Sequence, residues 1–257
     1  MSSKINWLIN NTNPGSIVLQ SWLSQNDIPP SLTQKYTKSN WLIKLRAGVY
    51  VRPGREPNWQ DALYCLTHQL NIPIHLAGLS SLAYQGKAHY LQHHEDKIWV
   101  HVSNKATLPK WFKEYDNSPW TLVTNNKLDS INQYDLTTIE TKGTKLATST
   151  AELAAYEILE AIPRLISFEQ AAELLQGLVN LSPKKVESLL KRSQSIRSNR
   201  LYLFFAHYYK HPWIKRIDES TINLGSGKRQ ITANGKLDKR YQITVPEKFI
   251  LEESADG

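Results

Sequence analysis

The sequence predicts an α+β protein, with an N-terminal winged helix-turn-helix followed by a mixed-sheet and helical C-terminal domain. Three observations predict it: short helical segments lead into a basic hairpin, β-rich runs follow, and helical periodicity returns after residue 149. We expect the winged helix at 1–57 and the C-terminal domain at 58–257, divided into a sheet-containing part, 58–148, and a helical part with terminal strands, 149–257. A chain of 257 residues allows each domain its own core.

The first 57 residues contain three predicted helices. Residues 2–10 place apolar side chains at helical spacing and end in an Asn-Pro-Gly turn. Residues 17–26, IVLQSWLSQN, predict a second helix with Ser16 as its cap. After the break at Pro29-Pro30, SLTQKYTKSNWL predicts a third helix that is short, polar and basic.

The third helix has the side chains of a DNA recognition helix. Gln and Ser can reach base edges in a major groove, and Lys and Thr can contact phosphates. The candidate DNA contacts on it are Ser31, Thr33, Gln34, Lys35 and Lys38. Two strands then alternate around the turn Ala47-Gly48, so the basic hairpin predicts a wing with three phosphate contacts, Lys44, Arg46 and Arg52. The alternative is a small three-helix cap on the larger domain.

The positive charge of the chain lies in two blocks. Residues 1–57 carry 7 Lys/Arg against 2 Asp/Glu, and residues 180–240 carry 14 against 4, within a total of +8. The blocks predict two surfaces for polyanions, or alternatively two solvated faces. A single cysteine, Cys65, excludes an internal disulfide and predicts a reducing compartment, which we take to be the cytoplasm. No apolar run reaches the length of a membrane span.

Alternating elements follow the winged helix. Residues 59–70 predict a helix, and IPIHLAG predicts a strand running into the helix SSLAYQG, with Ser80 as a cap. KIWVHVS, WTLVTNN, LTTIETKG and TKLATST predict strands, with Lys142-Gly143 as a hairpin turn. Three amphipathic helices come next, for which the candidate caps are Ser149 or Thr150, Ser167 and Ser182. LYLFFAHYY predicts a buried helix, and YQITVPEKF a strand.

Motifs for catalysis or metal binding are incomplete. LGSGKRQ at 224–230 lacks the first glycine and the Ser/Thr of a phosphate-binding P-loop, so a surface hairpin is the preferred interpretation. The potential metal ligands His89, His93, His94, Glu95, Asp96 and His101 match no helical metal-binding spacing, and we expect a polar loop instead. His75 is expected to be a half-buried strand histidine, and Glu152, Glu157 and Glu160 a solvated helix face. The chain is therefore not predicted to be an enzyme or to hold a metal or cofactor.

The C-terminal basic block is the strongest feature outside the predicted wing. Its candidate contacts for nucleic acid, or for an acidic toxin surface, are Lys184, Lys185, Lys191, Arg192, Lys228 and Arg229, with Arg197 and Arg200 in the same cluster. The alternative is that these side chains only keep a helical bundle soluble.

Several segments resemble one known family. GVYVRPGREPNWQDALYCL followed by IPIHLAGLSSLAYQGKAHYL, and more weakly LYLFFAHYYKHPWIKRID, LGSGKRQ and YQITVP, are similar to the AbiEi antitoxins, transcriptional regulators of bacterial abortive-infection toxin-antitoxin systems. The resemblance covers most of the chain. It implies promoter binding and repression by the winged helix, and a C-terminal domain that counters a nucleotidyltransferase-like toxin in a type IV system, where a stable complex with the toxin is not required.

The resulting prediction is an antitoxin that represses its own operon. Its expected partners are operator DNA with inverted repeats and the toxin, and the chain is expected to be a monomer or a cooperative pair on DNA. Two alternatives stay open: a ligand-sensing stand-alone regulator, which predicts a pocket, and a nucleic-acid-processing enzyme with a DNA-reading head, which predicts a cluster of carboxylates.

Overall fold

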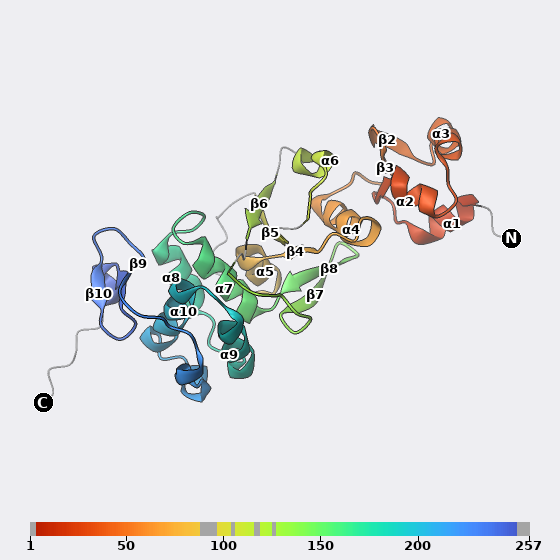
Figure 1. The fold of residues 1–257 in the computed structure, drawn as a ribbon. Helices are drawn as coiled ribbons and strands as arrows, with labels where there is room; N and C mark the ends of the chain where they lie inside the picture. Colours follow the sequence, from red (N-terminus) through yellow and green to blue (C-terminus); the bar gives the residue numbers. More distant parts are fainter. Residues whose placement is uncertain (1–3, 88–96, 104–105, 116–118, 125–126, 251–257) are drawn as a thin grey trace, which may run out of the picture. The chain divides into compact units, whose positions relative to one another are not determined.

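The computed structural model describes residues 4–87, 97–103, 106–115, 119–124 and 127–250 (Figure 1). Its contacts divide the chain into two compact units. Unit 1 contains residues 1–75, 102–120 and 140–146, and unit 2 contains residues 76–101, 121–139 and 147–257. The boundary at residue 57 stays a prediction.

Unit 1 begins with the element order of a winged helix. Its helices and strands are α1 (Lys4–Asn11), β1 (Ile17–Leu19), α2 (Gln20–Gln25), α3 (Pro30–Lys38), β2 (Ile43–Arg46) and β3 (Val49–Val51). The strands form an antiparallel sheet in the order β1-β3-β2. The predicted first and third helices and the hairpin around Ala47-Gly48 are confirmed.

The predicted second helix begins too early. Residues 17–19 are a strand, and the helix starts only at Gln20, so Ser16 does not cap it. The reason is tertiary: Ile17 and Leu19 pair with Val51 and Val49 of β3, and all three β1 residues are buried. Val18 packs in the core of the three helices with Leu8, Leu23, Ile28 and Leu42. A strand buried on both faces is continuously apolar, and a short run of that kind is not distinguished from a helix by its period.

Helix α4 (Trp59–Gln69) follows the wing and packs against β1. It begins with a capping box, in which the Asn58 side chain accepts from the Asp61 N–H and the Asp61 carboxylate accepts from the Asn58 N–H. At its other end, the Gln69 side chain accepts from Leu19 N–H at 2.8 Å and donates to Ile17 C=O at 2.7 Å. The Gln69 amide therefore pairs with backbone groups on the outer edge of β1, where no strand of the described residues is a neighbour.

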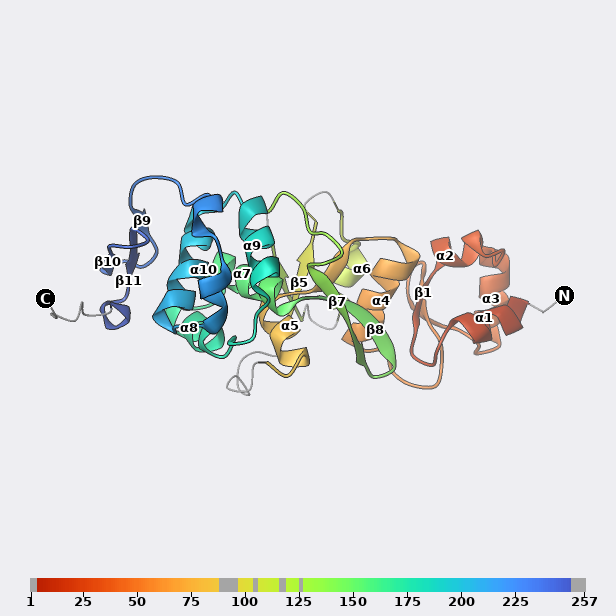
Figure 2. The same cartoon turned by 90° about the horizontal axis from the view of Figure 1, so that it is seen from below.

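A five-stranded sheet runs in the order β6-β5-β4-β8-β7 (Figure 1). Figure 2 shows β7 and β8 side by side. Its strands are β4 (Ile74–Leu76), β5 (Ile98–Val102), β6 (Trp120–Val123), β7 (Leu136–Thr141) and β8 (Thr144–Ser149). β4 and β8 are parallel, and β7 and β8 are joined by the predicted Lys142-Gly143 turn, both of whose residues have positive φ. The sheet is therefore mixed, as predicted. The four-residue helix α6 (Lys110–Lys113) precedes β6.

Five longer helices form the core of unit 2. They are α5 (Gly78–Tyr84), α7 (Ala151–Ala161), α8 (Phe168–Gln176), α9 (Pro183–Arg192) and α10 (Ile196–Tyr208). α7 is buried along nearly its whole length, and α10 carries the buried run Leu201–Ala206. Of the two candidates for α7, Thr150 is the cap, and Ser167 caps α8 as predicted, whereas Ser182 occupies the cap position of α9 without a side-chain hydrogen bond. The predicted Ser80 cap is wrong: α5 begins after Ala77, and the Ser80 hydroxyl, inside the helix, accepts from Trp99 N–H.

The C-terminal region adds a small sheet in the order β10-β11-β9. Its strands are β9 (Arg229–Gln230), β10 (Lys236–Asp238) and β11 (Ile243–Val245), accompanied by the 3-10 helices η2 (Pro212–Arg216), η3 (Glu219–Thr221) and η4 (Glu247–Phe249). Ile243 and Val245 are buried in the same hydrophobic cluster as α7 and α10. Among the described residues, no helix is long and apolar enough to cross a membrane.

Candidate nucleic-acid interface

Helix α3 presents a stripe of exposed polar side chains. The exposed members lie three, four and seven positions apart, which places them on one face of the helix: Ser31, Gln34, Lys35 and Lys38. Leu32 and Tyr36, on the other side, pack against the core of α1, α2 and α3. Pro30 begins the helix at a position where no hydrogen bond from its backbone N–H is needed. The described side chains form no ion pair with Lys35 or Lys38. Both ammonium groups are thus available to phosphates.

The structure corrects one predicted contact on this helix. Thr33 has 0% of its surface exposed, and its hydroxyl donates to Pro29 C=O at 3.3 Å. Its position between the two exposed turns faces the interior of unit 1. Thr33 therefore supports the fold of the helix and does not reach a bound duplex.

The predicted wing cations have three different environments. Lys44 is exposed on β2, and no ion pair to it occurs among the residues that the structure describes. Arg46 binds Glu114, with Nη1 2.6 Å from the Glu114 carboxylate and Nη2 3.4 Å from its C=O. Arg52 donates to Ile9 C=O, Thr12 C=O and the Thr12 hydroxyl, at 3.5, 3.1 and 3.1 Å. Arg52 thus closes the carbonyl end of α1 and is not presented as a phosphate contact.

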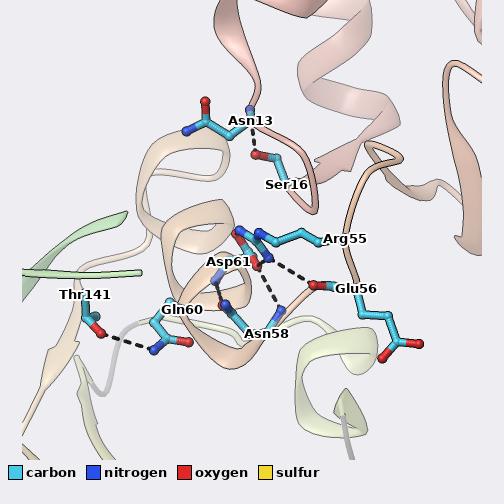
Figure 3. Close-up of polar contacts among 8 residues, drawn as sticks. All are labelled: Asn13, Ser16, Arg55, Glu56, Asn58, Gln60, Asp61 and Thr141. Carbon is cyan, nitrogen blue, oxygen red and sulfur yellow. Dashed lines mark hydrogen bonds and ion pairs between the residues drawn. The ribbon is translucent and has the colours of Figure 1, made fainter. Parts of the chain in front are cut away.

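The segment that follows β3 is joined to α4 by an ion pair between Arg55 and Asp61 (Figure 3). Arg55 donates to both carboxylate oxygens of Asp61, at 2.6 and 2.8 Å, and also to Glu56 C=O. These hydrogen bonds to Asp61 raise the pKa of the Arg55 guanidinium. A Cβ at Gly15, which has a φ of +81°, would lie 2.3 Å from the Arg55 guanidinium. The turn before β1 therefore needs glycine both for its backbone conformation and for the close approach of Arg55.

The C-terminal basic residues do not form one uniform surface. Lys184 and Lys185 are exposed in the first turn of α9. Lys191 pairs with Glu187 at 2.5 Å, and this hydrogen bond lowers the pKa of the glutamate. Lys228 is exposed, and Arg229 is half-buried and donates to Lys228 C=O. Lys184, Lys185 and Lys228 thus keep exposed charges that the predicted polyanion surface requires.

Three arginines of this block have structural contacts. Arg192 donates to Ser130 C=O at 2.5 Å and to the Asp135 carboxylate at 2.7 Å, so it holds the loop before β7. Arg197 binds Leu159 C=O and Ile162 C=O. Arg200 is 3% exposed and donates to the carbonyls of Leu224, Gly227 and Gln242. The Gly-rich segment 224–230 is therefore folded around a buried guanidinium, and Arg192, Arg197 and Arg200 are removed from the predicted interface.

The predicted solvated glutamate face of α7 is wrong. Glu157 is 0% exposed, and its carboxylate accepts from Gly78 N–H and the Ser149 hydroxyl, both at 2.7 Å. Glu152 is buried and accepts from Ser182 N–H, while Glu160 accepts from the Ser198 hydroxyl. These three carboxylates accept hydrogen bonds from backbone N–H groups and hydroxyls inside unit 2. The sequence of α7 is apolar on most sides, so its periodicity does not distinguish a buried glutamate from an exposed one.

Several histidines and acidic residues were considered as potential metal ligands or catalytic groups in the sequence. His89, His93, His94, Glu95 and Asp96 lie outside the described residues. His75 is buried, at 5% exposure, instead of half-buried as predicted, and His101 is buried on β5 at 8% exposure. Within the described part of the chain, no group of three or more His, Cys, Asp or Glu side chains could hold a metal ion.

Unit 2 has an aromatic-lined cavity of about 450 Å³ beside a polar cluster. Phe204, Tyr208 and Phe249 line it, and Tyr241 and His207 lie at its wall. The Glu219 carboxylate, next to the cavity, accepts from Tyr241 at 3.0 Å and contacts His207 and Arg240 at 2.8 and 2.9 Å. Unit 1 has a polar cavity of about 500 Å³, lined by residues of α1, α4 and the β7–β8 hairpin.

Comparison with protein families decides the assignment. Residues 1–93 match the model described as "Transcriptional regulator, AbiEi antitoxin N-terminal domain", and residues 95–246 match "Transcriptional regulator, AbiEi antitoxin, Type IV TA system". The chain belongs to the AbiEi antitoxin family. It is thus an antitoxin and transcriptional regulator of a type IV toxin-antitoxin system, as the sequence resemblance predicted, and the family description implies a non-enzymatic role.

A solved structure shares the fold of this AbiEi chain. It is the crystal structure of RV2827C protein from Mycobacterium tuberculosis, which is 16% identical, with a TM-score of 0.61, 93% of this chain covered and 88% of that one. At this identity the likeness concerns the fold alone. A search of the curated proteins finds no match. The α+β class, with an N-terminal AbiEi domain before a mixed-sheet and helical region, is confirmed.

Proposed function

We propose that this AbiEi chain represses its own operon by placing α3 in the major groove of operator DNA. The observation that carries the proposal is the exposed stripe of Ser31, Gln34, Lys35 and Lys38, on a helix whose opposite side is buried. Gln34 would read a base edge, and Lys35 and Lys38 would bind phosphates. Lys44 would add the wing contact, since its ammonium is exposed. The family's role as a transcriptional regulator supports DNA as the partner.

The second half of the proposal concerns the toxin. As an antitoxin of a type IV system, the chain acts against a toxin, which we infer to be nucleotidyltransferase-like and neutralised without a stable complex. Three exposed lysines of unit 2, Lys184, Lys185 and Lys228, are proposed as contacts for this activity. Their chemistry fits a polyanion, such as the nucleic acid on which a nucleotidyltransferase-like toxin would act.

Variants of the full chain separate the two activities. Promoter binding is measured by fluorescence anisotropy over a range of salt, and antitoxicity by growth rescue from the adjacent toxin gene. Lys35→Gln should weaken binding to all duplexes and flatten the salt slope by about one unit, whereas Gln34→Ala should relax sequence preference. Both variants should still rescue growth. The double variant Lys184→Gln/Lys185→Gln should reduce rescue and leave promoter binding unchanged.

The ligand-sensing alternative is favoured by one observation, the two cavities of about 450 and 500 Å³, which have the size of small-molecule sites. It predicts promoter binding that depends on an added small molecule, and no rescue. Growth rescue by the wild-type chain, together with promoter binding by the purified chain alone, would exclude it.

A further inference from the structure

Arg46, at the tip of the wing hairpin, already forms an ion pair with Glu114. Arg46 is the last residue of β2, and a register shift between Lys44 and Arg46 marks a bulge there. Its Nη1 lies 2.6 Å from Glu114 Oε2, with side chains that are 46% and 44% exposed. Both partners belong to unit 1, although 68 positions separate them in the sequence. A guanidinium binds carboxylate and phosphate oxygens with the same planar donors, and Glu114 already accepts from both Nη1 and Nη2, so a phosphate has to compete with Glu114 for these two groups.

Glu114 is held in place by its own segment. It is the C-cap residue of α6, where its backbone N–H donates to Lys110 and Phe112 carbonyls. Phe112 is fully buried and stacks on Trp120 at 4.4 Å, and the Trp120 indole N–H donates to Phe112 C=O at 3.0 Å. Lys110 lies 3.6 Å from the second carboxylate oxygen. The carboxylate that faces Arg46 is therefore presented by an anchored turn.

We propose that Glu114 is an intramolecular competitor of DNA: its carboxylate occupies the Arg46 guanidinium that a backbone phosphate would otherwise bind. The inference rests on the proposed function, since it assigns regulation to the same DNA interface. Lys44, two residues away on β2, provides the contrast, because no described carboxylate pairs with it. The wing thus has one cation open to DNA and one held by residues 110–115.

The exposure of the ion pair sets the size of the effect. Ion pairs between half-exposed side chains are weak, so Glu114 lowers the affinity for DNA by about two- to fivefold and does not abolish binding. Because Glu114 belongs to the segment 110–115 and not to the wing itself, a movement of that segment would change the affinity for DNA. A partner or a modification that displaces residues 110–115 would release Arg46 and tighten DNA binding, without touching α3.

A double-mutant cycle in the full chain tests the proposal. The probe is a fluorescein-labelled duplex from the region immediately upstream of the gene, and the variants are Glu114→Gln, Arg46→Gln and the double variant. Glu114→Gln should tighten binding about two- to fivefold and steepen the salt slope by about one phosphate contact. In the Arg46→Gln background the same change should give no further gain. The matched control is Glu56→Gln, because Glu56 is an exposed acid of unit 1 that forms no ion pair with a described residue.

Each outcome decides the matter. A gain specific to Glu114 and dependent on Arg46 supports the competition. An equal gain in Glu56→Gln, or a gain that persists without Arg46, overturns it, because general removal of negative charge would then explain the result. If wild-type chain does not bind the duplex, or if Lys35→Gln leaves binding unchanged, the proposed function fails and the competition fails with it. Normal α3 dependence without an effect of Glu114→Gln overturns the competition alone.

Discussion

Replacing Gln69 by methionine tests how the winged helix is attached to α4. The Gln69 amide forms two hydrogen bonds with the outer edge of β1, to Leu19 N–H and Ile17 C=O, and both are buried. Methionine has a similar length and keeps the packing of the aliphatic stem, but it offers neither a strong acceptor nor a donor. The substitution therefore leaves two backbone groups of β1 buried and unpaired.

The loss follows from those two groups. A buried polar group deprived of its partner costs about 1–3 kcal/mol, so Gln69→Met should lower the free energy of unfolding by about 2–5 kcal/mol. For an m-value of about 2 kcal/mol/M, the urea midpoint of the transition should fall by about 1–2.5 M. The residue itself is 8% exposed, but Gln69 and Ile17 also line the polar cavity of unit 1, so water that enters from that side moves the expected loss toward the lower end of this range.

Tryptophan fluorescence is the suitable probe, because six of the eight tryptophans belong to unit 1. Gln25→Met is the matched control, since Gln25 is exposed at the end of α2 and the same chemical change there should shift stability by less than about 0.5 kcal/mol. Equal midpoints for the two variants would refute the reasoning, because they would show that the amide contributes nothing to holding β1.

Three further predictions concern other parts of the chain. Arg192→Met should lower the unfolding free energy by about 1–3 kcal/mol, because it leaves the buried Asp135 carboxylate without its ion pair, and Lys185→Met on the same helix should not. Urea denaturation followed by circular dichroism compares the two, and similar curves would contradict the role of Arg192. Cys65 is fully buried, and burial raises the pKa of its thiol, so iodoacetamide should modify it only in urea. Mass spectrometry of the native protein measures this, and rapid native labelling would refute it. Burial opposes the ionisation of Glu219, but its contacts with His207, Tyr241 and Arg240 outweigh burial and lower its pKa below the ordinary 4.5. Its ionised form thus stabilises the fold above pH 4.5, and this stabilisation is lost as the pH falls through the lowered pKa. Thermal melts between acid and neutral pH should show a smaller decline for Glu219→Gln than for wild type, and parallel declines would contradict the assignment.

The elements of the fold were largely predictable from local signals. The α3 helix, the wing hairpin and the start of α4 each follow from a few adjacent residues, such as Pro30, Gly48 and Asn58. The strand β1 was not, because Ile17–Leu19 is too short and too evenly apolar for its period to separate strand from helix. Only its pairing with β3 decides the conformation.

The sequence identifies the basic and polar residues of the candidate site, but it does not show which acceptor each side chain binds in the fold. Thr33 falls between exposed residues in the sequence, yet the helical period turns it to the core. Arg46, Arg52, Arg192 and Arg200 look alike in a charge count, whereas each has an acceptor that lies between 24 and 68 positions away in the chain. Contacts at such separations leave no local pattern, so sequence reasoning overestimated the number of available cations.

If α3 reads the operator as proposed, the contacts of Gln69 and Arg55 determine which segment has to be transferred between family members to exchange DNA specificity. A graft that transfers only the segment ending at the wing would bring a β1 edge without its hydrogen-bonding partner and an Arg55 without Asp61. Such a chimera would have a less stable β1-β3-β2 sheet. The transferable cassette therefore extends through α4, and a recombination point that preserves both contacts lies after Gln69.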